Sequence, residues 1–302
     1  MAVLITLVLI YGGSLAFVRL RNKAHMPWGR QLTDFSTFMV PFNLPAYFSS
    51  RISTASRLPA GSFPQVQILE DNWEIIRDEA LALYQSNHIA TKDDLPGSNF
   101  YRDNRWKSFY LKVYDFNIPS ARQLAPTTMA LIDQVPGMNL ALFAVLMPGK
   151  RLTQHHDPFA FSVRYSLGLS TPNSEQCGLV VDGDHYAWRD GEAITFDETY
   201  LHAAYNDTDT PRIILMTDLD RPLRWRLLER IYYRFARAFN GLFYIDNLDP
   251  SITGIGNRMK EPVVRYKAYM KALKKAQPRK YRLGKWTLHL LLVGGLIYWT
   301  LA

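Results

Sequence analysis

Residues 193–217 read AITFDETYLHAAYNDTDTPRIILMT. Polar stretches typical of turns divide this sequence into three short apolar runs: Ala193–Phe196, His202–Tyr205 and Ile213–Thr217. Runs of this length that are rich in Ile, Thr, Tyr and Phe indicate β-strands. The stretch therefore predicts neighbouring β-strands joined by tight turns.

The same pattern extends toward the N-terminus. Strand-like runs alternate there with turn dipeptides, the runs being Leu140–Leu146, Phe161–Leu169 and Gly178–Val181 and the dipeptides Pro148-Gly149, Asp182-Gly183 and Asp190-Gly191. Many short strands with hairpin turns predict a β-sandwich or barrel. We therefore expect a mainly β domain over residues 63–222, with helical segments flanking it.

The two ends of the chain are apolar. Residues 1–18 contain no Asp, Glu, Lys, Arg or His, and among these types residues 286–302 contain only His289. A helix of eighteen residues spans roughly 27 Å, which approaches the hydrocarbon thickness of a bilayer. We expect a transmembrane helix at each end. A cleaved signal peptide would carry its basic residues before the apolar run, whereas here they follow it, and two buried core helices would leave these basic residues unexplained.

Basic residues gather beside both apolar ends. Residues 19–30 carry four basic and no acidic side chains, and residues 258–285 carry eleven basic and one acidic. These stretches contribute +14 to a chain whose net charge is +8, so the remainder carries −6. The positive-inside rule then places residues 19–285 in the cytoplasm and both termini across the membrane. The charge favours an anionic lipid surface as partner and does not indicate a nucleic-acid-binding core.

Two segments connect the anchors to the β domain. Residues 19–62 form a juxtamembrane segment, and residues 223–285 form a basic helical segment. Within the latter, apolar residues from Trp225 to Phe239 recur on one helical face, with arginines largely off it. This amphipathic helix either covers the core with a solvated basic face or lies on lipid. The single cysteine, Cys177, excludes an intrachain disulfide and a multi-cysteine metal site.

Candidate metal ligands lie within the β domain. His155 and Asp157 are two residues apart, which places both side chains on one face of an extended strand, whereas His156 points the other way. His202 follows on another predicted strand. Two imidazoles and one carboxylate form the 2-His-1-carboxylate triad that holds ferrous iron and leaves positions open. We therefore predict a metal site at His155, Asp157 and His202.

Arginines supply candidate anion sites in the same domain. Arg212 begins an apolar strand ten residues after His202, where its guanidinium can pair with a carboxylate deep in the barrel. The alternative is a structural salt bridge with Asp197 or Asp218. Arg164 and Ser166 share one strand face and either contact a cosubstrate or form an outward polar face.

These positions together resemble one known family, the aspartyl/asparaginyl β-hydroxylases, which are iron(II)/2-oxoglutarate dioxygenases. The residues that carry the resemblance are Pro148-Gly149, His155-x-Asp157, Arg164, Phe196-Asp197 with His202, and Arg212. The resemblance runs from about Phe63 to Pro222, and the anchors and the segment Arg30–Phe48 extend it to the membrane-bound lipid A 2-hydroxylases of bacteria. It implies a double-stranded β-helix core of the jelly-roll or cupin-like kind.

The resemblance also implies roles for individual residues. His155 and His202 match the iron-binding histidines, Arg212 the arginine on the C5 carboxylate of 2-oxoglutarate, and Arg164 the arginine near the C1 carboxylate. Peptide-hydroxylating members have Gly where this chain has Asp157, and His where it has Ser166. Asp157 thus completes the triad here, whereas the contact of Ser166 with the cosubstrate stays open.

The function implied by the resemblance is hydroxylation of a lipid. Fe(II), 2-oxoglutarate and O₂ would be used to hydroxylate the α-carbon (2-position) of a secondary acyl chain of lipid A, or of a lipid A precursor. The location implied is the bacterial inner membrane, with the catalytic domain facing the cytoplasm. Independently, the two predicted anchors favour a lipid over a soluble peptide. Arg221, Arg224 and Arg226 follow the last strand, where they can meet the phosphates or sugars of lipid A.

Three other functions remain alternatives at this point. Hydroxylation of an aspartyl or asparaginyl peptide is also known in the family. His202 and Asp207 form the H-x₄-D pattern of glycerolipid acyltransferases, in which the histidine acts as general base. That pattern leaves His155, Asp157 and Arg212 unexplained. A non-catalytic lipid-binding scaffold is the third alternative, and binding of iron and 2-oxoglutarate separates the dioxygenase from the last two.

Overall fold

The computed structural model describes residues 2–89, 105–258 and 260–281. Its strands are β1 (Trp106–Val113), β2 (Met138–Leu146), β3 (Lys150–Arg151), β4 (Ser162–Ser170), β5 (Cys177–Val181), β6 (Asp184–Ala187), β7 (Ala193–Phe196), β8 (His202–Asn206) and β9 (Arg212–Asp220). Its helices are α1 (Ala2–Arg21), α2 (Trp28–Gln31), α3 (Phe35–Ser49), η1 (Pro64–Val66), α4 (Gln67–Asp71), α5 (Trp73–Gln85), α6 (Pro119–Leu124), α7 (Pro126–Ile132), α8 (Arg226–Gly241), α9 (Ile255–Arg258) and α10 (Lys260–Ala276).

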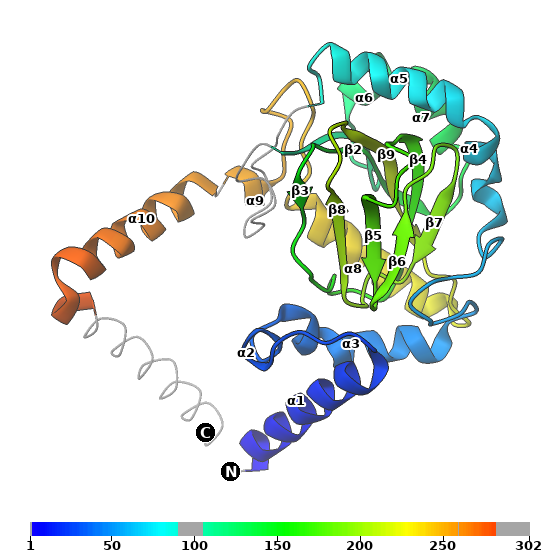
Figure 1. Cartoon of the computed structure of the whole chain (residues 1–302). Coiled ribbons are helices and arrows are strands. Elements are labelled where there is room, and N and C mark those ends of the chain that lie inside the picture. Colours follow the sequence, from blue (N-terminus) through cyan, green and yellow to red (C-terminus); the bar gives the residue numbers. More distant parts are fainter. Residues whose placement is uncertain (1, 90–104, 259, 282–302) are drawn as a thin grey trace.

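Two antiparallel sheets form the centre of the molecule (Figure 1). One sheet has the strand order β1-β2-β9-β4-β7, and the other has the order β3-β8-β5-β6. From β2 to β9 the chain passes repeatedly between the two sheets, as in the double-sheet jelly roll of cupins. The prediction of a mainly β, jelly-roll core with flanking helices is therefore confirmed.

Turns connect the strands at the positions of the three dipeptides, but only the turn at Asp182-Gly183 closes a hairpin, because the strands joined at the other two lie in different sheets. Asp182 and Gly183 join β5 to β6, and both have positive φ, of 53° and 89°. Two consecutive residues with positive φ make the hairpin turn whose twist matches that of antiparallel strands. Gly149 and Gly191 also have positive φ, at 68° and 73°.

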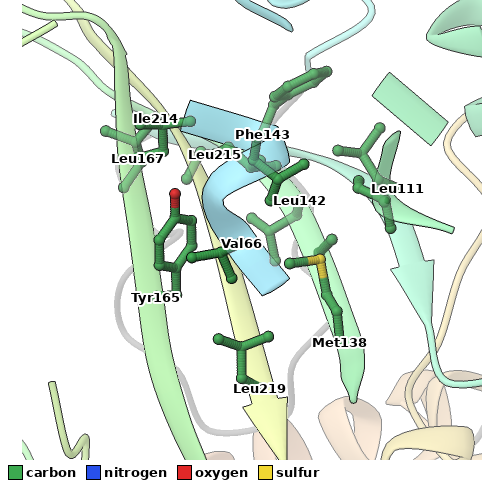
Figure 2. Close-up of a cluster of buried hydrophobic side chains, with 14 of the residues drawn as sticks. Val66, Leu111, Met138, Leu142, Phe143, Tyr165, Leu167, Ile214, Leu215 and Leu219 are labelled. Atoms are coloured by element: carbon green, nitrogen blue, oxygen red, sulfur yellow. The ribbon is translucent and has the colours of Figure 1, made fainter. Parts of the chain in front are cut away.

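Alternation along β4 divides the larger sheet into two different faces. Val163, Tyr165 and Leu167 are buried on the face that α5 covers. Figure 2 shows Tyr165 and Leu167 with Leu215, and Val66 lies among them. The side chains of Arg164 and Ser166 point to the opposite face, because successive residues of a strand face opposite ways. The apolar face holds the fold together and leaves the inner face for a polar site.

The helices that follow β9 also match the sequence-based expectation. In α8 the side chains of Tyr232 and Ala236 are buried, and the ring of Phe235 lies 5.3 Å from that of Phe159. Arg226, Arg230 and Arg234 are exposed, so the helix covers the core with a basic outer face. Trp225 and Ile231 differ from the expectation, since they are 60% and 48% exposed.

Helix α1 is attached to the barrel at its C-terminal end. Arg21 forms an ion pair with Asp197 at 2.7 Å, and Asp197 also pairs at 2.7 Å with Arg221. Just beyond, the Asn22 side chain accepts a hydrogen bond from Leu201 N–H, and the backbone of Lys23 donates to Asp182. The rest of α1 projects away from the barrel (Figure 1).

In the described part of the chain, one helix is long and apolar enough to cross a membrane, at Val3–Arg21. Most of its surface is exposed rather than packed in a core. This observation agrees with an N-terminal apolar helix and argues against its burial. The second predicted transmembrane helix, residues 286–302, lies outside the described residues.

The buried group of Arg21, Asp197 and Arg221 gives a test of how α1 is attached. Replacing Asp197 with Ala leaves two buried guanidinium groups without their carboxylate, and breaking a buried ion pair costs about 3–5 kcal/mol. We expect Asp197→Ala to lower the free energy of unfolding of the full chain in detergent by this amount. The control is Asp184→Ala, because the ion pair of Asp184 with Lys23 is exposed. Equal stability of the two variants would contradict this interpretation.

Candidate metal and carboxylate site

His155 and His202 are paired through their backbones. The N–H of each donates to the carbonyl of the other, at 3.0 and 2.9 Å, which ties the segment after β3 to the start of β8. The two imidazole rings consequently lie close together, with centroids 4.2 Å apart. Asp157 is held beside them because its backbone N–H donates to the carbonyl of Glu198 at 2.9 Å.

The three predicted ligands converge. Each residue offers one ligand atom, and these atoms all lie within 4.8 Å of one another. The Nδ1 atoms of His155 and His202 are hydrogen-bonded to the carbonyls of Thr153 and Tyr200, both at 2.9 Å. Such second contacts fix the ring orientation and leave Nε2 available for a metal ion. His156 lies apart, buried and hydrogen-bonded to the carbonyl of Thr199, as the alternation predicts.

The protonation states at this cluster favour metal binding. Burial, assisted by the neighbouring His155, lowers the pKa of His202 to about 3, so its imidazole is neutral at physiological pH. Burial alone would raise the pKa of Asp157, but the Arg164 guanidinium and the two imidazoles outweigh it and lower that pKa. A neutral imidazole and an ionised carboxylate are the forms that ligate metals.

Arg164 is surrounded by carboxylates of the chain itself. Its guanidinium contacts Asp157 at 3.0 Å, Asp218 at 2.8 Å and Glu198 at 2.5 Å. The side chain is 15% exposed, so the alternative of an outward polar face is wrong. These contacts orient Asp157, and they occupy the donors that the resemblance implied for the C1 carboxylate of a cosubstrate.

Glu198 belongs to this cluster although the sequence analysis did not identify it. Its Oε1 accepts a hydrogen bond from the Ser162 hydroxyl at 2.8 Å. Burial raises the pKa of Glu198 well above its usual range, against the attraction of Arg164. The only sign of Glu198 in the sequence is that it directly follows Phe196-Asp197. An acidic residue next to another acidic residue does not indicate that its side chain is buried.

Arg212 is a buried guanidinium without an ion pair among the described residues. It is 3% exposed, its Nε has no hydrogen-bond partner, and its guanidinium carbon lies 5.2 Å from the centroid of the Trp188 ring. Burial lowers its pKa to about 10. The salt-bridge alternatives are wrong, because Asp197 pairs with Arg21 and Arg221, and Asp218 pairs with Arg164.

Arg212 lies on the same side of its sheet as the triad. Strand β9 pairs with β2 and β4 without a bulge in β9 itself. Its side chains from Arg212 to Asp218 therefore alternate regularly between the two faces of the sheet. Residues 212 and 218 are an even number apart and therefore face the same way. Since Asp218 contacts Arg164 beside Asp157, Arg212 also faces the barrel interior. Ser166 is 2% exposed and, two residues from Arg164, lies on this inner face too.

The three arginines predicted to meet a lipid headgroup are separated by the structure. The side chain of Arg221 is fully buried with Asp197 and donates to the carbonyl of Ala160, so it is not free to meet a headgroup. Arg224 and Arg226 are exposed. Arg221 also borders a cavity of about 610 Å³ between β9 and α8, which no triad residue lines.

The acyltransferase pattern does not form a site. His202 and Asp207 lie at opposite ends of β8, and five residues of strand span roughly 16 Å. The carboxylate of Asp207 pairs instead with Arg151, whose Nε lies 2.9 Å away. Asp207 therefore cannot orient His202, and the H-x₄-D prediction is wrong.

A jelly roll with a 2-His-1-carboxylate cluster defines the class of protein, and the comparisons give the family. Residues 70–222 match the family model described as Aspartyl/Asparaginyl beta-hydroxylase, so the chain belongs to the aspartyl/asparaginyl β-hydroxylase family. The predicted resemblance is confirmed. The description of the family names a hydroxylase.

Among individual proteins, the ornithine lipid ester-linked acyl 2-hydroxylase of Rhizobium tropici is 30% identical over 167 residues, covering 54% of this chain and 59% of that protein. Human aspartate beta-hydroxylase domain-containing protein 2 is 32% identical over 166 residues, covering 52% of this chain and 44% of that protein. The chain thus spans about half the length of these relatives. A Cupin 2 conserved barrel domain protein from Salinispora arenicola aligns at 13% identity with a TM-score of 0.28, covering 47% of this chain and 93% of that one. This structural similarity is weak.

The ligand assignment predicts how neighbouring histidines differ. His202→Ala removes an inward imidazole and should abolish binding of Fe(II), or of Co(II) as its substitute, in a titration of the full chain in detergent. His156→Ala should keep metal binding. It should lower the free energy of unfolding by about 1–3 kcal/mol, because the carbonyl of Thr199 loses its hydrogen-bond donor. Metal binding that survives in His202→Ala would contradict the assignment, as would its loss in a folded His156→Ala protein.

Proposed function

We propose that the protein is an Fe(II)- and 2-oxoglutarate-dependent dioxygenase that hydroxylates the α-carbon of an acyl chain of lipid A. The single observation that supports 2-oxoglutarate as cosubstrate is the environment of Arg212. Its guanidinium is buried, has no ion pair in the described chain and faces the same barrel interior as the triad. An uncompensated buried charge is costly, so its retention indicates an anionic ligand. 2-Oxoglutarate offers such a carboxylate at the end opposite its metal-chelating ketoacid group.

The donor set fits the proposed cofactor. Two imidazole Nε2 atoms and the Asp157 carboxylate would hold ferrous iron on one face, and Arg164 keeps that carboxylate ionised and oriented. When bound, iron together with 2-oxoglutarate and O₂ supplies the oxidising power that inserts oxygen into an unactivated C–H bond.

The chain itself supplies position and a dry environment. Arg212 would pair with the C5 carboxylate through two parallel hydrogen bonds, and the Trp188 ring flanks its guanidinium. Ser166 borders the same interior. No side chain of this chain needs to transfer a proton in such a reaction.

A lipid substrate is supported by two observations. Helix α1 is exposed and apolar and is fixed to the barrel through Arg21 and Asn22, close to His202. The name of the Rhizobium tropici relative describes hydroxylation of an ester-linked acyl chain at its 2-position. We propose location at the bacterial inner membrane with the catalytic domain toward the cytoplasm, because basic residues follow the apolar run of α1. Lipid A rather than ornithine lipid is proposed from the resemblance.

Mass spectrometry of membrane lipids tests this proposal. Cells that contain the protein should show lipid A with one added oxygen on one acyl chain, and cells that contain His202→Ala should not. His185→Ala is the matched control, because this histidine is exposed on β6 and should keep activity. Added oxygen on ornithine lipid alone would replace the lipid A assignment, and unchanged lipids would contradict lipid hydroxylation.

The role of Arg212 predicts opposite effects on stability and on cosubstrate binding. Arg212→Lys keeps the charge but loses the bidentate geometry, and losing one charge-assisted hydrogen bond costs roughly 1.5–3 kcal/mol. We expect 2-oxoglutarate affinity to fall on the order of 10- to 150-fold. Arg212→Met removes the unpaired buried charge, so it should raise the melting temperature of the ligand-free protein while abolishing 2-oxoglutarate binding. If Arg212→Lys bound 2-oxoglutarate with unchanged affinity, another residue would have to hold the C5 carboxylate.

A further inference from the structure

Helix α3 buries several polar side chains and exposes three large aromatic ones, although Phe42 of the same helix packs against the core. Its buried positions are mostly polar or small: Ser36, Thr37, Val40, Asn43, Ala46 and Ser49. Its most exposed aromatic residues are Phe35, Phe38 and Phe48, at 54%, 53% and 76%. A surface helix of a soluble protein buries its apolar stripe and exposes its polar one. The three exposed aromatic side chains indicate that this part of the surface of α3 does not meet water.

The polar inner face of α3 is used by the fold. The Asn43 side-chain amide donates to the carbonyl of Pro158 at 2.8 Å, and its oxygen accepts from Ala160 N–H at 3.0 Å. Pro158 directly follows the triad residue Asp157. The inner face therefore holds the segment that carries a candidate metal ligand, whereas Phe35, Phe38 and Phe48 remain more than half exposed.

The apolar surface continues from α3 onto its neighbours. At one end, the ring of Phe38 stacks on Tyr11 of α1 at 4.8 Å, and the Tyr11 hydroxyl donates to the carbonyl of Leu32. At the other end, Arg224 N–H donates to the carbonyl of Ser49, which brings Trp225 next to the end of α3. We call this surface the α3 apolar face, and its exposed members are Trp28, Leu32, Phe35, Phe38, Phe48 and Trp225.

The position and charge of this face identify what covers it. In Figure 1, α3 lies between the barrel and the apolar helix α1. The α3 apolar face is thus continuous with the exposed apolar residues of α1. Exposed arginines flank it, namely Arg30, Arg51 and Arg224. An apolar face with a basic rim matches the boundary between acyl chains and anionic headgroups.

We infer that the α3 apolar face lies in the surface of the bilayer that α1 enters, as a second membrane contact of the protein. This inference rests on the proposed function only in that α1 is taken as a membrane anchor. The contact would set the segment that carries His155 and Asp157 near the lipid surface. The ring of Phe35 lies 6.4 Å from that of Phe159, two residues beyond Asp157, and Arg30 donates to the carbonyl of Gln154, next to His155. An acyl chain could then reach the site without leaving the bilayer completely.

Spin labels on the full chain in lipid nanodiscs with anionic phospholipid test the inference. Single cysteines are introduced as Phe38→Cys and Phe48→Cys, with Leu9→Cys on α1 as the lipid-exposed control and Asp209→Cys after β8 as the water-exposed control. Native Cys177 is buried and burial raises its pKa to about 11, so it reacts little with the label. Accessibility to O₂, which concentrates in lipid, and to a water-soluble nickel complex is measured at each site.

The inference predicts that labels at 38 and 48 resemble the label at 9, with high O₂ and low nickel accessibility. Nickel accessibility equal to that of position 209 would overturn it, as would low accessibility to both reagents, which would indicate coverage by protein. The readout requires neither iron nor turnover, so it stands or falls separately from the dioxygenase reaction. A label at 9 that is accessible to nickel would instead overturn the anchor on which the inference rests.

Discussion

The interior of this barrel is organised by the need to compensate buried guanidinium groups. Arg221 is compensated by Asp197, and Arg164 by three carboxylates that include Asp157. The first pairing attaches α1, through Arg21, to the segment before His202, and the second orients a candidate metal ligand. Arg212 alone of these three has no carboxylate in the described chain. The same physical constraint thus builds the site and marks where an anionic ligand belongs.

The position of α1 relative to the cluster gives the membrane a role in substrate choice. Asn22, at the end of α1, bonds to Leu201, and Asn43 of α3 holds the residues after Asp157. Both contacts lie within one or two residues of a triad member. In the proposed function, a lipid that approaches along these helices would reach the cluster directly.

The sequence predicted the strands and the triad because both rest on local patterns. Short apolar runs, Asp-Gly turns and the two-residue spacing of His155 and Asp157 are properties of neighbouring residues. The charge partners were not predictable, because Asp197, Asp218 and Glu198 are indistinguishable acidic residues until the sheets place each one. The same limit hid strand β1, where Trp106–Val113 lacks a turn signal, and the burial of Arg221. The exposed aromatic side chains of α3 could be recognised only once the structure showed which side of the helix is buried.

Labelled oxygen tests the central claim most directly. Full-length protein in vesicles with lipid A, Fe(II) and 2-oxoglutarate would be supplied with heavy-isotope O₂, and the products would be weighed by mass spectrometry. The account predicts one labelled atom in the acyl hydroxyl group and one in succinate, in equal amounts. A hydroxyl oxygen that derives from water, or hydroxylation that proceeds without forming succinate, would contradict it.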